Sequence, residues 1–313
     1  MSFWRRQRVV VTGGAGFLGS HVVDRLRAAG CTGIVVPRRR DCDLTVRSAV
    51  RSLMDSVRPT IVLHLAAVVG GIGANRAHPA RFFHDNMVMG VELLEAARLA
   101  GVGKVVVAGT ACEYPRAAPL PFREEDLWNG YPEATNAPYA IAKRALLVAG
   151  QAYRAEHGLP VAHVVPANLY GPRDSFDLER GHVIPALIRK CVEARDLGAR
   201  SVTCWGSGRA SREFLYVDDA AQGLLLAAER YDDPEPVNLA TGREIAIAEL
   251  AATIARLTGY DGELAWDPSK PDGQPRRCLD TTRAVGFGFR ATTGLEAGLA
   301  ATIRWYEARR ASA

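Results

Sequence analysis

The chain has 313 residues, of which 48% are hydrophobic, 23% charged and 7% aromatic. This composition excludes a disordered protein, and only six cysteines in a chain of this length exclude a small disulfide scaffold. No apolar run approaches the roughly 20 residues that a membrane-spanning helix needs, so we expect no membrane partner. The formal net charge is a mild +5, and the longest basic run is Arg38 to Arg40, so we expect no nucleic acid partner.

The cysteines and the first residues bear on the cellular compartment. The six cysteines form no CxxC pair, which favours a reducing compartment and argues against a metal site and against disulfides. The apolar stretch before the first glycine turn is too short for a signal peptide. We therefore expect a cytoplasmic protein.

Hydrophobic periodicity predicts alternating strands and helices in the first half of the chain. Strands are predicted at 8–12, 34–36, 60–65, 104–109 and 161–166. Helices are predicted at 17–29, 47–57, 79–100 and 139–157. This alternation is typical of an α/β fold with a doubly wound parallel sheet, the Rossmann architecture.

The pattern becomes shorter and more mixed after about residue 169. Shorter segments are predicted at 182–194, 202–205, 214–217, 220–229, 247–258 and 295–308. We therefore expect a dinucleotide-binding Rossmann domain over 1–169. A later segment, around 214–240, is expected to cross back into this domain. The rest of 170–313 is expected to form a smaller, mixed α/β substrate region.

A glycine-rich turn follows the first predicted strand. Gly13, Gly16 and Gly19 form a G-x-x-G-x-x-G pattern that opens the first helix. Glycine allows the backbone to turn sharply against a pyrophosphate, and the N-terminus of a helix favours negative charge. The pattern in this position predicts a dinucleotide site.

The end of the second strand bears on the choice of cofactor. An acidic residue there would bond a ribose hydroxyl, but this chain has Arg38, whose guanidinium can bind a phosphate through two hydrogen bonds. We therefore expect NADP, while Asp43 nearby keeps NAD possible. The expected cofactor contacts are Gly13, Gly16, Phe17, Leu18, Gly19, Arg38, Asp43, Leu44, Leu65, Ala66, Ala67, Lys143, Pro166, Asn168, Leu169 and His182.

Tyr139 and Lys143 are the predicted proton-transfer residues. They are one helical turn apart in the run YAIAK, so both side chains emerge on one face of a helix. An ammonium group close to the phenol would lower its pKa and make Tyr139 an acid–base catalyst. Thr110 follows the fourth strand, at the edge where ligands of parallel sheets bind, and its hydroxyl can hold a carbonyl oxygen.

Several longer runs resemble the extended short-chain dehydrogenase/reductases, and among them the GDP-L-fucose synthases. The runs are HLAAVVGGIGAN (64–75), GTACEYP (109–115), YAIAK (139–143), NLYGP (168–172), HVIPALIRK (182–190), WGSGRASREFLYVDDAA (205–221) and KPDGQPRRCLD (270–280). The resemblance extends from the glycine turn almost to the end of the chain. It implies an NADPH-dependent epimerase/reductase that acts on GDP-4-keto-6-deoxy-D-mannose.

The resemblance also implies roles for individual residues. Thr110, Tyr139 and Lys143 match the hydride-transfer triad, and Cys112 and His182 match the acid–base pair that inverts the sugar. The positions expected to bind the nucleotide sugar are Lys190, Trp205, Arg212 and Lys270. A homodimer through the helices 79–100 and 139–157 is also implied.

Two positions depart from the family pattern, and rival functions remain. The family usually has serine where Thr110 lies and an apolar residue where Glu113 lies. A 4-epimerase that retains its NAD, or a 4-ketoreductase of another nucleotide sugar, would share most of this scaffold. A 4,6-dehydratase would carry an Asp-Glu pair where this chain has Ala111 and Cys112, and a silent dinucleotide sensor would commonly have lost Tyr139 or Lys143.

Overall fold

The computed structural model describes residues 3–178, 181–270 and 272–311. Its centre is a six-stranded sheet with the order β2-β1-β3-β4-β5-β9, and all five neighbouring pairs are parallel. The strands are β1 (Arg8–Thr12), β2 (Gly33–Val35), β3 (Ile61–His64), β4 (Lys104–Ala108), β5 (Val161–Pro166) and β9 (Val237–Leu239). The predicted α/β fold with a parallel, doubly wound sheet is confirmed.

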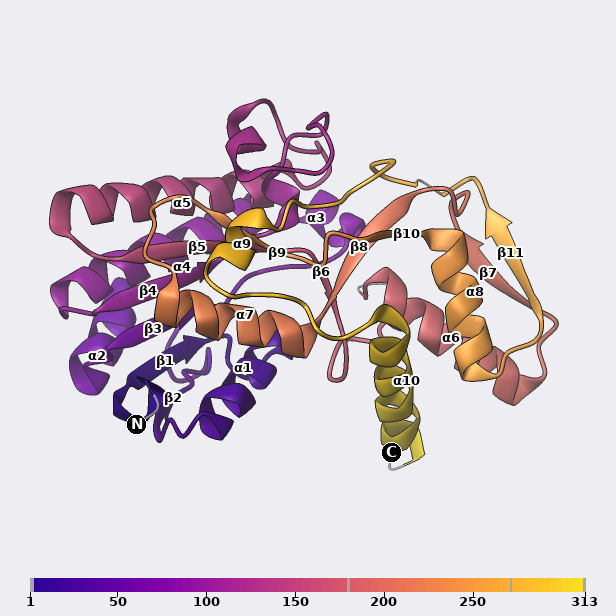
Figure 1. Cartoon of the computed structure of the whole chain (residues 1–313), viewed down its shortest axis with the longest axis horizontal. Coiled ribbons are helices and arrows are strands. Elements are labelled where there is room, and N and C mark those ends of the chain that lie inside the picture. The colour runs from indigo at the N-terminus through magenta and orange to yellow at the C-terminus, as the bar shows by residue number, and fades with distance from the viewer. Residues whose placement is uncertain (1–2, 179–180, 271, 312–313) are drawn as a thin grey trace.

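Helices cover both faces of this sheet (Figure 1). One face carries α1 (Phe17–Ala28) and α7 (Val217–Arg230). The other face carries α2 (Arg47–Val57), α4 (Pro79–Leu99) and α5 (Ala137–His157). Because successive strand residues point to opposite faces, Val9 and Val11 join the first core while Val10 joins the second.

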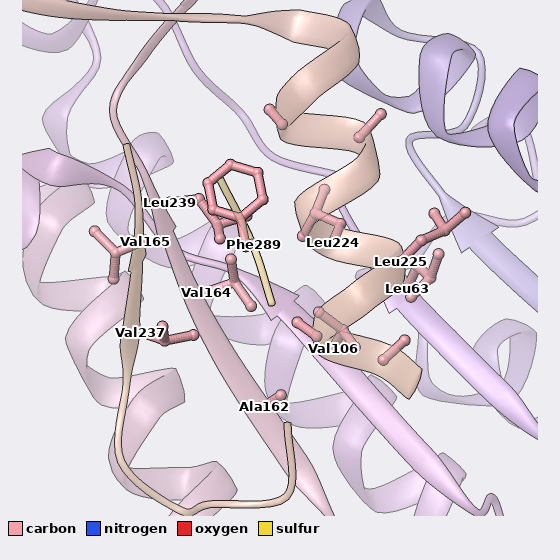
Figure 2. Close-up of a cluster of buried hydrophobic side chains, with 14 of the residues drawn as sticks. Leu63, Val106, Ala162, Val164, Val165, Leu224, Leu225, Val237, Leu239 and Phe289 are labelled. Carbon is pink, nitrogen blue, oxygen red and sulfur yellow. The ribbon is translucent and has the colours of Figure 1, made fainter. Parts of the chain in front are cut away.

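The core beneath α7 fixes how the second half of the chain returns to the sheet. Figure 2 shows Leu224 and Leu225 of α7 near Val106 of β4 and Val164 of β5. A Cβ on Gly223 would lie 2.6 Å from the Leu239 side chain, so β9 and α7 pack at a distance that needs glycine. Residues 217–239 therefore belong to the core of the six-stranded sheet.

Much of the second half of the chain forms a second lobe, on the right of Figure 1. It holds a three-stranded sheet of β6 (Asn168–Tyr170), β8 (Ser211–Tyr216) and β10 (Glu244–Ala246), and the parallel pair β7 (Ser201–Trp205) and β11 (Glu263–Asp267). The helices α6 (Val183–Leu197), α8 (Ile247–Thr258) and α10 (Leu295–Ala311) share one apolar core there. None of the described helices is both long and apolar enough to cross a membrane.

The longer predicted elements all exist within a few residues of their predicted bounds. The elements that the sequence pattern did not reveal are β6, β9, β10, β11, α3 (Ile72–Ala77), α9 (Thr282–Gly286) and the short 3-10 helices η1 (Phe3–Arg6), η2 (Ala111–Glu113) and η3 (Glu124–Trp128). All of them have three to six residues, which is too short for a period of 2.0 or 3.6 to show.

Candidate active site

A cleft of about 510 Å³ opens between the ends of β1, β2 and β3. Gly13 has a φ of +70°, and a Cβ at this position would lie 2.7 Å from the backbone nitrogen of Ala66. A Cβ on Gly19 would collide with the Gly13 carbonyl oxygen, so the turn needs glycine at both positions. The strand order reverses between β2 and β3 at β1, and such a switch point is where parallel α/β sheets bind their ligands.

Most of the predicted cofactor residues line this one cleft. They are Gly13, Gly16, Phe17, Leu18, Gly19, Arg38, Asp43, Leu44, Leu65, Ala66 and Ala67. Pro166, Asn168 and Leu169 lie instead at the end of β5 and in β6, outside its lining. Asn168 Nδ2 donates a hydrogen bond of 2.8 Å to the Glu213 carbonyl oxygen.

Two arginines after β2 differ in their partners. The Arg39 Nε lies 3.4 Å from Asp43 Oδ2, and the same carboxylate accepts hydrogen bonds from the Thr45 nitrogen and hydroxyl. The bonds from Thr45 hold the pKa of Asp43 below its ordinary value. Among the described residues none forms a salt bridge or hydrogen bond with the Arg38 guanidinium, so it is free to bind an anionic group in the cleft.

The 110–113 turn follows β4 and consists of Thr110 and η2. Thr110 Oγ1 accepts a hydrogen bond of 3.3 Å from the Cys112 nitrogen, and Glu113 Oε1 accepts one of 2.7 Å from the Thr110 nitrogen. These reciprocal bonds form a capping box that fixes the turn at the carboxyl end of β4.

Tyr139 and Lys143 project from the N-terminal half of α5 toward this turn, and both are buried. Burial raises the pKa of Tyr139 well above its ordinary range, the nearby Cys112 and Glu113 add to the rise, and a hydrogen bond with Thr110 opposes it. Burial lowers the pKa of Lys143 to about 8, against the opposing effect of Glu113.

The Tyr-x-x-x-Lys spacing suggested that Lys143 lowers the pKa of Tyr139, and the structure contradicts this. Lys143 Nζ donates a hydrogen bond of 2.8 Å to the Ala108 carbonyl oxygen, and the loss of hydration dominates at the phenol. The phenol therefore stays protonated at neutral pH, a state that suits a proton donor.

Cys112 lies beside two guanidinium groups. Arg277 Nη1 is 3.8 Å from Cys112 Sγ, and Arg277 is fixed by a hydrogen bond of 2.8 Å to Gln274 Oε1. Burial lowers the pKa of Arg212 to about 10, Arg277 adds to this, and Asp272 and Cys112 oppose it. Thr110, Cys112, Glu113, Tyr139, Lys143, Arg212 and Arg277 thus form one cluster of polar side chains, built from separate segments, which we call the polar pocket.

His182 lies elsewhere, at the N-cap of α6. It lines a second cleft of about 1540 Å³, which shares Gly16 and Phe17 with the first one. The buried Asp174 lines the same cleft; burial raises the pKa of Asp174, and His182 opposes the rise. No contact within the described parts of the chain joins His182 to Cys112.

Trp205 presents an exposed indole in the second lobe, at the end of β7. Lys190 Nζ lies 5.7 Å and Lys270 Nζ 5.6 Å from the centre of this ring. An aromatic face with two adjacent ammonium groups can stack a base and attract a phosphate. Three of the four predicted substrate residues are therefore neighbours, and the fourth, Arg212, lies in the polar pocket.

Comparison with known families identifies the scaffold. The model of the NAD dependent epimerase/dehydratase family matches residues 9–240. The chain belongs to this family. As a member of the NAD dependent epimerase/dehydratase family, it has the glycine turn, the Thr110 turn and the Tyr139–Lys143 pair within the matched range.

Several relatives of this family member have names that specify a reaction. It is 43% identical to the "GDP-L-fucose synthase" of Sinorhizobium fredii over 94% of this chain and 93% of that protein. It is 40% identical to the "GDP-L-fucose synthase" of Escherichia coli K12, over 96% of this chain and 97% of the relative. A solved "gdp-l-fucose synthetase from Naegleria fowleri bound to NADP" has a TM-score of 0.91 and 30% identity, covering 100% of this chain and 98% of that one.

Two parts of the polar pocket were not predicted from the sequence. Arg277 lies in the run KPDGQPRRCLD, but the pattern cannot tell which of Arg276 and Arg277 faces Cys112. Arg276 pairs with Glu244 on the outside, whereas Arg277 turns inward to Gln274. The buried carboxylate of Glu113 was visible as a departure from the family pattern, but its partner His163 gave no signal.

Proposed function

We propose that this protein is an NADPH-dependent epimerase/reductase that converts GDP-4-keto-6-deoxy-D-mannose to GDP-L-fucose. The observation that carries the proposal is the polar pocket. It combines a buried tyrosine, hydrogen-bonded to Thr110, with a thiol that has an arginine at 3.8 Å. A 4-epimerase or simple ketoreductase needs the first part and has no use for the second.

The residues that would hold NADPH fit that molecule. The close approach of Gly13 to Ala66 leaves no space for a side chain at position 13, and the N-terminus of α1 lies beside the turn for the pyrophosphate. Arg38, whose guanidinium has no partner in the described part of the chain, would bind the 2′-phosphate, while Asp43 is occupied by Thr45 and Arg39. These contacts favour NADP over NAD.

The chain's own residues would carry the proton of the reduction. Bound NADPH supplies a hydride to sugar carbon 4. Tyr139 donates its proton to the oxygen on that carbon, and its raised pKa keeps the proton available until the oxygen becomes basic. Thr110 orients the phenol through their hydrogen bond, and Lys143 contributes positive charge below a pH of about 8.

Cys112 and His182 would move the protons of the epimerisation. The carbonyl at carbon 4 acidifies the hydrogens on carbons 3 and 5, so one group removes a proton and the other returns one to the opposite face. Arg277 beside Cys112 stabilises the negative charge that forms on the thiol when it gives up its proton.

The GDP portion would bind across the second lobe. The Trp205 indole stacks the base between the ammonium groups of Lys190 and Lys270, and Arg212 attracts the diphosphate. With the GDP portion bound in this way, the sugar would lie at the polar pocket.

Incubation of the purified protein with GDP-4-keto-6-deoxy-D-mannose and NADPH tests the proposal. We expect one NADPH to be oxidised for each GDP-L-fucose that forms, with NMR of the product as the assay. A protein that interconverts nucleotide sugars with retained NAD and no net oxidation would instead be a 4-epimerase, and the proposal would be wrong.

We also propose a cytoplasmic homodimer. Phe83 and Val91 of α4 and Val148 of α5 are exposed apolar side chains on two helices that pack together, and a second copy would cover them. All six cysteines are free, which suits a reducing compartment. Light scattering should give twice the chain mass of 33.8 kDa, and Val148→Glu should reduce it.

A further inference from the structure

Glu113 and His163 form a fully buried pair beneath the 110–113 turn, and the proposed mechanism assigns no role to it. Their exposed fractions are 0% and 1%. His163 Nε2 lies 3.0 Å from Glu113 Oε2 and 3.2 Å from Oε1, while Oε1 also accepts the 2.7 Å bond from the Thr110 nitrogen. One carboxylate thus joins β5 to the residue that contacts Tyr139.

Gly109 lies directly against this pair. A Cβ on Gly109 would lie 2.5 Å from His163 Nε2 and 2.6 Å from Glu113 Oε1, so glycine at 109 lets the two side chains meet. Arg144 Nε donates a hydrogen bond to the Glu113 carbonyl oxygen and fixes the turn from the side of α5. A buried polar contact enclosed in this way is held in one geometry.

The hydrogen bonds indicate where the protons lie. His163 Nδ1 is buried and has no hydrogen-bond partner among the described residues. A charged imidazole would leave an N–H there without an acceptor, so the neutral ring with its proton on Nε2 is favoured. His163 then donates to Glu113, and the carboxylate keeps its negative charge.

Glu113 faces two basic groups, Lys143 and Arg144, of which Lys143 belongs to the proton-transfer residues. The groups around the carboxylate are His163 of β5, Cys112 of the turn, Tyr114 directly after it, and Tyr139, Lys143 and Arg144 of α5. Lys143 also faces the buried His64 of β3, whose pKa burial and Lys143 together lower to about 3, so His64 is neutral. Glu113 is therefore the anion near the buried ammonium group of Lys143.

We propose that Glu113, oriented by His163, is a positioning residue that locks the 110–113 turn and supplies the negative charge opposite Lys143. The proposal deepens the proposed function, because it rests on Thr110, Tyr139 and Lys143 acting together in proton transfer. Neither Glu113 nor His163 touches the sugar or the cofactor in this role.

Glu113→Gln removes the negative charge of the side chain and nearly preserves its shape. Glutamine keeps an oxygen that accepts the Thr110 N–H bond but loses the charge. We expect the titration midpoint of Lys143, followed by NMR of its ε-carbon, to fall by about one pH unit. NADPH oxidation above that midpoint should then fall about tenfold, with the KM for the nucleotide sugar within about twofold of wild type.

Glu124→Gln is the matched control. Glu124 is also buried and accepts a backbone hydrogen bond, of 2.9 Å from Asn238, but it is not among the groups that act on Lys143. We expect this variant to leave the Lys143 midpoint and the pH profile unchanged. An equal shift in both variants would show a general effect of losing a buried carboxylate and would overturn the proposal.

A second variant covers the case in which Glu113→Gln does not fold. His163→Gln preserves the carboxylate and an N–H donor, so the Lys143 midpoint should remain within about 0.3 pH units of wild type. In the wild-type protein, NMR of the His163 ring nitrogens should show a neutral ring with its proton on Nε2. A charged His163 ring, or an unchanged Lys143 midpoint in a folded Glu113→Gln protein, contradicts the proposal. The Lys143 midpoint and the state of the His163 ring are both measured without turnover. They therefore test this proposal even if the proposed function is wrong.

Discussion

The cofactor cleft and the polar pocket are assembled in opposite ways. All residues that line the cofactor cleft come from one continuous stretch, between Gly13 and Met89. The polar pocket takes its groups from η2, α5, β8 and the segment that contains Arg277, which is 165 positions away from Cys112. Local chain geometry thus builds the first site, whereas the second depends on the correct packing of the whole chain.

The largest expected effect comes from Tyr139→Phe, which removes one oxygen from the polar pocket. The rate of NADPH oxidation should fall by about 10²- to 10⁴-fold, because the phenol is the proton donor. Tyr153→Phe on the same helix, which loses a hydrogen bond to Glu95 outside the site, should keep the wild-type rate. Equal rates in the two variants would show that Tyr139 is not the proton donor.

Cys112→Ala tests whether the thiol in the polar pocket carries the epimerisation. Exchange of sugar hydrogens with solvent should fall by about 10²-fold or more, because no thiol remains to move the proton. Cys278→Ala, another partly exposed free cysteine, is the control and should keep normal exchange. Exchange that survives in the Cys112 variant would mean that another group performs the epimerisation.

Arg38→Ala tests the cofactor cleft alone. The KM for NADPH should rise by about 10- to 100-fold, because a charged hydrogen bond contributes about 1.5–3 kcal/mol, while the KM for NADH should not change. Arg40, whose side chain is 85% exposed and lies 3.5 Å from Asp41, provides the control variant Arg40→Ala. A rise for both cofactors would indicate a folding defect in the cleft.

The smallest expected effect is the pH dependence that Lys143 gives to stability and activity. Burial lowers the pKa of Lys143 to about 8, so the folded protein loses this proton as pH rises through that value, whereas the unfolded chain keeps it to higher pH. The contribution of this group to the free energy of unfolding therefore increases between about pH 8 and pH 10. The kcat/KM for NADPH oxidation should decline over the same range, and a flat profile would contradict the assignment.

The same contrast explains what could be predicted from the sequence. Eleven predicted cofactor residues between Gly13 and Ala67 line the cleft, because they follow strands and turns that periodicity locates. Ala15, Pro37, Cys42 and Thr45 line it too and were not named in advance. The pKa of Tyr139 was predicted in the wrong direction, because spacing along a helix says nothing about burial. The contacts of Arg277 and His163 depend on β-strand neighbours and loops far away in the chain, and no local pattern encodes them.

Labelling by solvent tests the central claim most directly. Wild-type protein is incubated with GDP-4-keto-6-deoxy-D-mannose and NADPH in deuterated water, and NMR locates the deuterium in the product. Because we propose that one site epimerises and then reduces, we expect GDP-L-fucose with deuterium at carbons 3 and 5 and none at carbon 4. A reduced product that carries no deuterium at either carbon would contradict the account and leave a plain ketoreductase.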